Sequence, residues 1–157
     1  MGVFMKINTT KFGETEIEED KIIVFSDGIL GFESIKRFTI IKTEDTIPFY
    51  WLQALDEDIS LPCIDPLEFF PQYTPIINEE DMIKIDAYSV YDLLVLNTIV
   101  VREKPFCATA NLAAPIVVNI ANNRGAQIVI QNSDYKVREP LVQIKEGSGS
   151  AGIIKAD

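Results

Sequence analysis

The sequence contains no histidine, the side chain that most often acts as a general acid or base near neutral pH. Histidine is also the commonest protein ligand of transition metals, so its absence disfavours both a histidine-based catalytic triad and a zinc site. We therefore expect that the protein is not an enzyme and that it uses no metal or other cofactor.

Cysteine is scarce, and long apolar runs are missing. Cys63 and Cys107 show neither a CxxC spacing nor the electropositive surroundings that activate a thiol, so both are interpreted as buried structural residues in a reducing compartment. No apolar run approaches the roughly 20 residues that span a bilayer, and the first residues lack the apolar core of a signal peptide. The sequence therefore predicts a cytoplasmic protein without a membrane contact.

Basic residues are outnumbered, with 14 Lys and Arg against 24 Asp and Glu and a net charge of −10. Residues 1–110 hold 20 acidic and 9 basic residues, whereas residues 111–157 hold 4 and 5. Because phosphate backbones are bound by clustered Lys and Arg, this pattern argues against direct nucleic-acid binding. It favours a basic protein partner.

The length of 157 residues and the 47% hydrophobic content are typical of one globular domain with a real core. We place this domain at residues 5–144. Residues 145–157 are rich in small flexible residues and are expected to form a flexible tail, and residues 1–4 are also left outside the expected fold.

Alternation with a period of two dominates the chain. Expected strands cover residues 21–25, 38–42, 49–55 and 92–103, two segments around 107–119, and residues 126–131 after the turn signal at 122–125. The segment 92–103 is almost continuously apolar, which indicates burial on both faces. Short strands at this spacing predict an all-β fold, a compact antiparallel barrel-like domain or a sandwich.

Helix is expected only as one or two short turns. Asn78 precedes carboxylates that favour the positive end of a helix dipole, which predicts a short helix over residues 78–86. A brief helix is also expected at residues 67–70, and residues 31–38 could form a turn of helix. Four prolines indicate that residues 61–77 form an irregular connection.

Motifs for phosphate or calcium chemistry are weak. The sequence has no GxxxxGK[ST] loop, and Gly28–Gly31 ("GILG") is interpreted as a turn. The acidic clusters at residues 16–20 and 56–58 lack the alternating ligand spacing of a calcium loop, so they are interpreted as solvated loops.

The segment "TANLAAPIVVN", residues 109–119, combines polar, small and β-branched residues. Alternation places Phe106, Ala108, Ala110 and Leu112 on one face, and Pro115 then interrupts the ladder because it lacks an N–H. We expect a strand, a kink and a second strand. Asn111 and Asn119 would bond backbone groups freed by the kink or, alternatively, a partner segment that adds to the strand edge.

Five motifs in sequence resemble the FliW family of flagellar assembly factors over about residues 5–142. They are "KFGETEI" from Lys11, "FSDGILGFE" from Phe25, "PFYWLQALDED" from Pro48, "TANLAAPIVVN" from Thr109, and "GAQIVI" followed by "YKVREPL". Two positions depart from the family pattern. Leu30 stands where proline is usual, and Ala113 replaces a common basic residue before the Ala-Pro pair.

The resemblance implies a non-catalytic adaptor with a β-barrel-like fold. Members of the family bind two proteins in alternation, cytoplasmic flagellin and CsrA, an RNA-binding repressor of flagellin translation. Flagellin that has not been exported would occupy the adaptor and release CsrA onto the flagellin message. An acidic adaptor suits this role because CsrA needs a basic surface to hold RNA.

The candidate partner contacts fall into three groups. The acidic loops expected to face CsrA contain Glu44, Asp45, Asp56, Glu57 and Asp58. The glycine turn presents Phe32 and Glu33, and the kinked segment presents Asn111 and Asn119. We expect a monomer.

Several alternatives stay open. The acidic residues could serve solubility alone, and the aromatic residues near position 50 could belong to the core. The protein could be a flagellin-specific chaperone without CsrA regulation, a small-ligand-binding β-barrel or, ranked last, a structural component of the flagellum.

Overall fold

The computed structural model of the protein describes residues 2–103, 107–131, 133–143 and 154–155. The strands are β1 (Phe4–Thr9), β2 (Gly13–Glu18), β3 (Ile23–Phe25), β4 (Arg37–Ile41), β5 (Tyr50–Ala54), β6 (Ser60–Ile64), β7 (Leu93–Arg102), β8 (Cys107–Ala110), β9 (Ile116–Asn119), β10 (Arg124–Gln127), β11 (Glu139–Gln143) and β12 (Ile154–Lys155). The helices are α1 (Pro66–Phe69) and α2 (Glu79–Lys84), with 3-10 turns at Glu19–Lys21 and Val90–Asp92.

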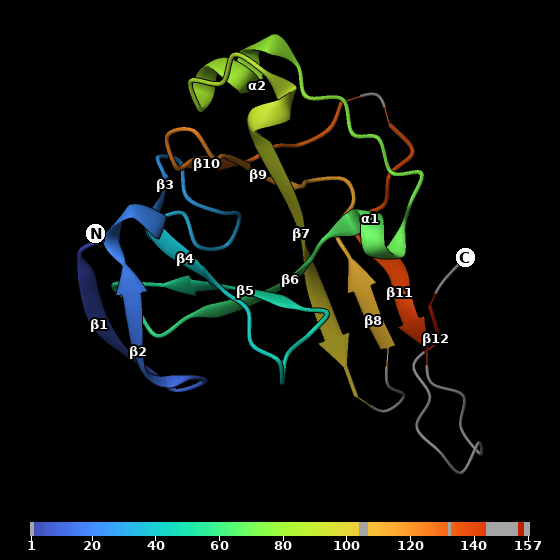
Figure 1. Ribbon diagram of the computed structural model, residues 1–157. Helices are drawn as coiled ribbons and strands as arrows, with labels where there is room; N and C mark the ends of the chain where they lie inside the picture. Colours follow the sequence, from blue (N-terminus) through green and yellow to red (C-terminus); the bar gives the residue numbers. More distant parts are fainter. Residues whose placement is uncertain (1, 104–106, 132, 144–153, 156–157) are drawn as a thin grey trace.

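Seven strands close into a barrel in the order β7-β6-β5-β4-β3-β10-β9, and the pairing of β9 with β7 completes the ring (Figure 1). Neighbouring strands run antiparallel except β3 and β10, which are parallel. The expected all-β, barrel-like class is confirmed. The parallel pair departs from the expected antiparallel arrangement.

Strand β7 belongs to two sheets. Its first half, Leu93 to Leu96, pairs with β9, whereas its last part, Ile99 to Arg102, pairs with β8. Strands β8, β11 and β12 continue from this last part as a lateral sheet beside the barrel (Figure 1). The prediction that both faces of this segment are buried is wrong at Leu94 in its first half and at Val100 and Val101 near its end, because these side chains are exposed.

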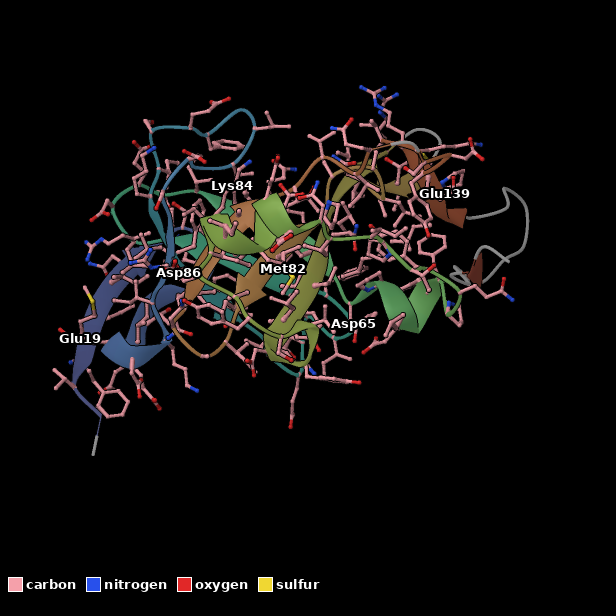
Figure 2. The ribbon with its side chains drawn as sticks, turned by 90° about the horizontal axis from the view of Figure 1, so that it is seen from above. Glu19, Asp65, Met82, Lys84, Asp86 and Glu139 are labelled. Carbon is pink, nitrogen blue, oxygen red and sulfur yellow. The ribbon has the colours of Figure 1, made fainter. Side chains whose placement is uncertain are left out.

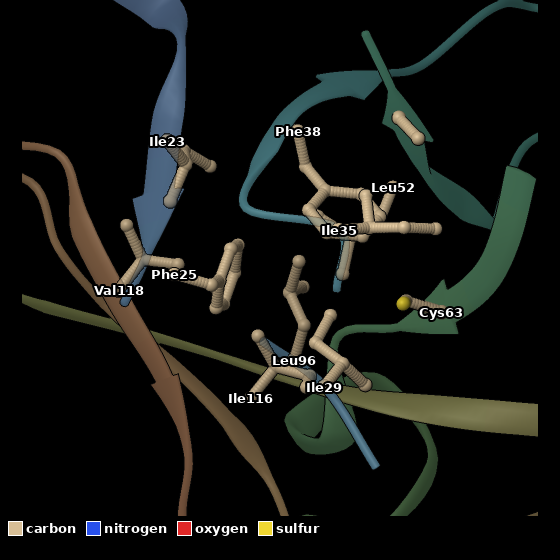
Figure 3. Close-up of a cluster of buried hydrophobic side chains, with 11 residues drawn as sticks. Ile23, Phe25, Ile29, Ile35, Phe38, Leu52, Cys63, Leu96, Ile116 and Val118 are labelled. Atoms are coloured by element: carbon tan, nitrogen blue, oxygen red, sulfur yellow. The ribbon is translucent and has the colours of Figure 1, made fainter. Parts of the chain in front are cut away.

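Large apolar side chains fill the barrel interior (Figure 3). Phe25 and Phe38 meet edge to face with ring centroids 5.4 Å apart, and Leu52 is fully buried beside them. Gly125 lies against the ring of Phe25, where a Cβ would come within 2.6 Å of Cε1. The interior is therefore a packed core.

Two smaller cores flank the barrel. One lies between α1 and the lateral sheet, and it includes Phe69, Tyr73, Ala110 and Leu141. The other lies under α2, which covers β9 and β10 (Figures 1 and 2). The predicted N-cap of α2 is confirmed, because the side chain of Asn78 accepts a hydrogen bond from the Asp81 N–H at 2.8 Å.

Several elements were not predicted. The β1–β2 hairpin forms a separate two-stranded sheet. The interpretation of residues 61–64 as irregular is wrong, because they lie in β6. Pro62 is tolerated there because β6 pairs with β7 only from Cys63 onward, so Pro62 lies where β6 has one neighbouring strand. In β11 the register shifts after Pro140, as in a β-bulge.

Other boundaries also differ from expectation. Residues 31–36 form turns without helix, and the strand expected at 126–131 begins earlier and ends at Gln127. β1 begins at Phe4, inside the segment left out of the expected domain. Within the expected tail, Ile154–Lys155 pairs with β11, and Phe106 lies outside the described residues.

Candidate partner-binding surfaces

The five acidic candidates do not form one surface. Glu44 and Asp45 lie in the turn between β4 and β5, whereas Asp56, Glu57 and Asp58 lie in the turn between β5 and β6. These two turns are at opposite ends of β5, about 16 Å apart for a strand of this length. A partner that contacted all five carboxylates would have to extend along the whole length of β5.

Two carboxylates of the β5–β6 turn have partners within the chain. Asp56 accepts hydrogen bonds from Arg37 Nε at 3.0 Å and Nη2 at 2.6 Å, and these bonds hold the pKa of Asp56 below its usual value. Asp58 accepts from the side chain and the N–H of Thr10, which also lowers its pKa. Glu57 is exposed and forms no ion pair with the described residues.

The tip of the β1–β2 hairpin is fastened to the barrel at this turn. Besides the Thr10–Asp58 contact, Lys11 Nζ lies 3.8 Å from the ring centroid of Trp51, and the ring of Phe12 meets Trp51 edge to face. The hairpin therefore covers part of Trp51. Asp56 and Asp58 have structural roles here that their clustering in the sequence did not reveal.

The β4–β5 turn presents its carboxylates freely. Thr43 and Thr46 close the turn through hydrogen bonds between their side chains and backbone groups. Glu44 and Asp45 lie between them, exposed, and neither forms an ion pair within the described part of the chain. This turn is the better candidate for a contact with a basic partner.

The segment Gly28–Gly31 forms a turn, as predicted. Gly28 has φ +68°, and a Cβ there would lie 2.5 Å from the carbonyl oxygen of Glu33. Phe32 is half-buried against the barrel core. The exposed Glu33 carboxylate accepts a hydrogen bond from the Gly31 N–H at 3.0 Å, which lowers its pKa.

Gln127 joins this loop to the kinked segment. Its Oε1 accepts from the Leu30 N–H at 2.9 Å, and its Nε2 donates to the Ala114 carbonyl at 3.1 Å. The side chain of Asn111 caps the same kink by accepting from the Ala114 N–H at 3.0 Å. Phe32, Glu33 and Asn111 therefore lie on segments that Gln127 brings together.

Asn119 has a structural role. It is 2% exposed, its amide nitrogen donates to the carbonyls of Ile85 and Asp86, and its side-chain oxygen accepts from the Ala121 N–H. A partner cannot reach this side chain, so we withdraw Asn119 as a contact residue. The predicted strand, kink and strand over β8 and β9 are confirmed.

The two cysteines differ in burial. Cys63 is fully buried, and burial raises the pKa of its thiol to about 12, as expected of a structural cysteine. Cys107 is only half-buried. Within the described residues, no group of three or more Cys, Asp or Glu side chains has the geometry of a metal site.

A cavity beside α1 was not predicted from the sequence. Its volume is about 830 Å³, and it is lined by Glu68, Phe69, Phe70, Pro71, Gln72, Tyr73, Leu112, Asp134, Tyr135, Lys136 and Glu139. These residues come from α1, the segment after it, the kink, the segment before β11 and the first residue of β11. The aromatic run at residues 69–73 was the available signal, but only the fold brings Tyr135 to it.

Search of the described residues for a helix long and apolar enough to cross a bilayer finds none. Strand pairing makes the described chain a small closed β-barrel with a lateral sheet, and its candidate sites are exposed loops and a lateral cavity. The sequence matches the family model described as FliW protein over residues 6–141. The chain therefore belongs to the FliW family.

Individual relatives support this family assignment. A flagellar assembly factor FliW from Caldanaerobacter subterraneus is 41% identical over 141 residues, covering 88% of this chain and 94% of that protein. One from Syntrophomonas wolfei is 37% identical and covers 98% and 99%. A crystal structure of the flagellar assembly factor FliW superposes with a TM-score of 0.79 at 31% identity, covering 87% of this chain and 96% of the other. The chain is a flagellar assembly factor of a non-catalytic family and not an enzyme.

Proposed function

We propose that this protein is a monomeric cytoplasmic adaptor that binds flagellin and CsrA in alternation and so couples flagellin synthesis to export. Membership in the FliW family supports a role in flagellar assembly. The observation that carries the CsrA part is the freely exposed acidic β4–β5 turn on a chain of net charge −10. An RNA-binding repressor offers the complementary basic surface.

The two partners are assigned to different surfaces. We assign CsrA to the β4–β5 turn with Glu44 and Asp45, because these carboxylates have no partner among the described residues. We assign flagellin to the loop with Phe32 and Glu33 and the kink with Asn111, where the strand ladder is interrupted. Glu57 is a secondary candidate for the CsrA contact.

Calorimetric titration with purified CsrA at low and raised salt tests this function, followed by the same titration with flagellin already bound. We expect binding that weakens with salt, because exposed charges are screened, and that flagellin abolishes. The double variant Glu44→Gln with Asp45→Asn should weaken CsrA binding several-fold. Glu57→Gln, at the secondary candidate position at the other end of β5, should weaken it less.

Failure of CsrA to bind at any salt would refute the adaptor mechanism, and binding of flagellin alone would identify a flagellin-specific chaperone. The small-ligand-barrel alternative requires a hollow barrel. The barrel interior is instead filled by apolar side chains (Figure 3), and the cavity beside α1 lies outside it.

A further inference from the structure

The cavity beside α1 is preformed by contacts within the chain. Tyr73 Oη donates to the Leu112 carbonyl at 2.7 Å, and the Thr74 N–H donates to Tyr135 Oη at 3.0 Å. The rings of Tyr73 and Tyr135 meet edge to face with centroids 4.7 Å apart. The Leu112 N–H donates to the Lys136 carbonyl at 3.0 Å. The aromatic walls are therefore held in place before a ligand arrives, which lowers the entropic cost of binding.

The lining combines aromatic rings with unpaired carboxylates. Four aromatic side chains line the cavity, namely Phe69, Phe70, Tyr73 and Tyr135. Among its charged residues, Asp134, Lys136 and Glu139 form no ion pair with the described residues, while Glu68 already has an interaction of its own. Leaving Glu68 aside, the lining holds two carboxylates and one ammonium group, so its charge is negative.

Aromatic faces and carboxylates together favour one kind of ligand. Aromatic rings attract guanidinium and ammonium groups through their quadrupole, and arginine also stacks on them through its planar group. Carboxylates add charge-assisted hydrogen bonds to the same group. The volume of about 830 Å³ is within the usual range for ligand sites and exceeds what one side chain needs. The remaining space suits apolar neighbours of the cationic residue.

From these observations we infer that the cavity beside α1 is a peptide-binding site for a protein segment that carries an arginine between apolar residues. The arginine lies against the aromatic walls, with its guanidinium group directed to Asp134 and Glu139. This site is separate from the β4–β5 turn and from the glycine turn, but Leu112 places it next to the kink with Asn111 that we assign to flagellin. A short peptide tests its occupation without either of the partners proposed above.

The probe is the peptide acetyl-Leu-Arg-Leu-amide, titrated into the full ¹⁵N-labelled chain and followed by amide chemical shifts. We expect saturable shifts at the backbone amides of the lining residues, including Tyr73, Leu112 and Tyr135. The neutral analogue acetyl-Leu-citrulline-Leu-amide has nearly the same shape and should bind at least about tenfold more weakly. Equal affinity of the two peptides, or shifts confined to other surfaces, would overturn the inference.

Variants separate charge from shape. The double variant Asp134→Asn with Glu139→Gln keeps the side-chain size and should weaken the arginine peptide about tenfold while leaving the citrulline peptide unchanged. Tyr135→Leu keeps an apolar wall but removes a ring, and it should also reduce the preference for arginine. Glu44→Gln with Asp45→Asn is the matched control and should have no effect. Thermal unfolding of each variant checks that the fold is intact, and an effect of the control equal to that of the cavity variant would also overturn the inference.

Discussion

The closed barrel and the lateral sheet follow the same strand-pairing rules, but they are filled differently. The barrel interior holds Phe25, Phe38 and Leu52, all fully buried, whereas the inward positions of β8 are Ala108 and Ala110. These small residues pack against Phe69 and Tyr73 from the segment that covers the sheet, and the cavity lies among the covering residues rather than at Ala108 or Ala110. The difference teaches that the barrel fills its interior with side chains of its own strands, whereas the lateral sheet needs α1 and the residues after it to complete its core, and the cavity lies among these added residues.

The largest expected effect tests the barrel side of this comparison. Phe38→Ala should lower the free energy of unfolding by roughly 3–5 kcal/mol, because it removes a fully buried ring and leaves a void. Phe70→Ala makes the same change at a half-buried wall of the cavity and should cost at most about 2 kcal/mol. Urea unfolding followed by circular dichroism measures both. Equal losses in the free energy of unfolding for the two variants would contradict the difference between the packed barrel and the cavity wall.

A smaller effect is expected from the polar contacts behind the cavity. Tyr73→Phe removes the donor to the Leu112 carbonyl and an acceptor for Asn97, and it should cost about 1–2 kcal/mol. Tyr88→Phe, at a position 95% exposed, is the control and should have almost no effect.

The pH dependence sharpens the same test. Burial raises the pKa of Tyr73 from 10 to about 12, so the folded state favours the protonated phenol. The contribution of the Tyr73 phenol to the free energy of unfolding is complete below pH 10. It is lost as the pH rises toward 12. The wild type should therefore lose more stability than Tyr73→Phe over this interval, and parallel curves would contradict the assignment.

The smallest effect is expected at the exposed end of the barrel. Asp56→Asn removes the ion pair with Arg37 and should cost less than about 1 kcal/mol, because both side chains are exposed. The bond to Arg37 lowers the pKa of Asp56 in the folded state. The contribution of Asp56 to the free energy of unfolding is therefore present above its ordinary pKa of 3.8, and it is lost as the pH falls through the lower pKa of the folded state. Glu57→Gln is the neutral control. Unfolding in urea at neutral and acidic pH should show the two variants converging in acid.

The sequence predicted the elements whose local signals agree with their surroundings. Residues 92–103 were predicted as a long strand and form β7, and Asn78 with its acidic neighbours marked α2. The missed strands β6 and β11 both contain a proline, Pro62 and Pro140, which local rules exclude from a regular ladder. Only the tertiary pairing shows that the first lies beside a single strand and the second at a bulge.

The candidate site was less predictable, because the availability of a charge depends on distant residues. In the sequence, Asp56 and Asp58 look equivalent to the exposed pair Glu44 and Asp45. In the structure, Arg37 binds Asp56, and Thr10 binds Asp58 from 48 positions away in the chain. The cavity likewise requires Tyr135 to meet Tyr73. No periodicity or motif within one segment contains that information.

The double membership of β7 has a practical consequence for dissecting this protein. A shortened chain that ends at or before Arg102 would lose β9 and β10 as well as β8, so that β7 would pair only with β6 and the barrel would stay open. A shortened chain that ends after Gln127 would keep the strands of the barrel and β8 but would lose β11, which leaves β8 as an unpaired edge and invites aggregation. The barrel and the lateral sheet are therefore inseparable as soluble fragments, and point substitutions rather than truncations are the suitable tools for assigning their functions.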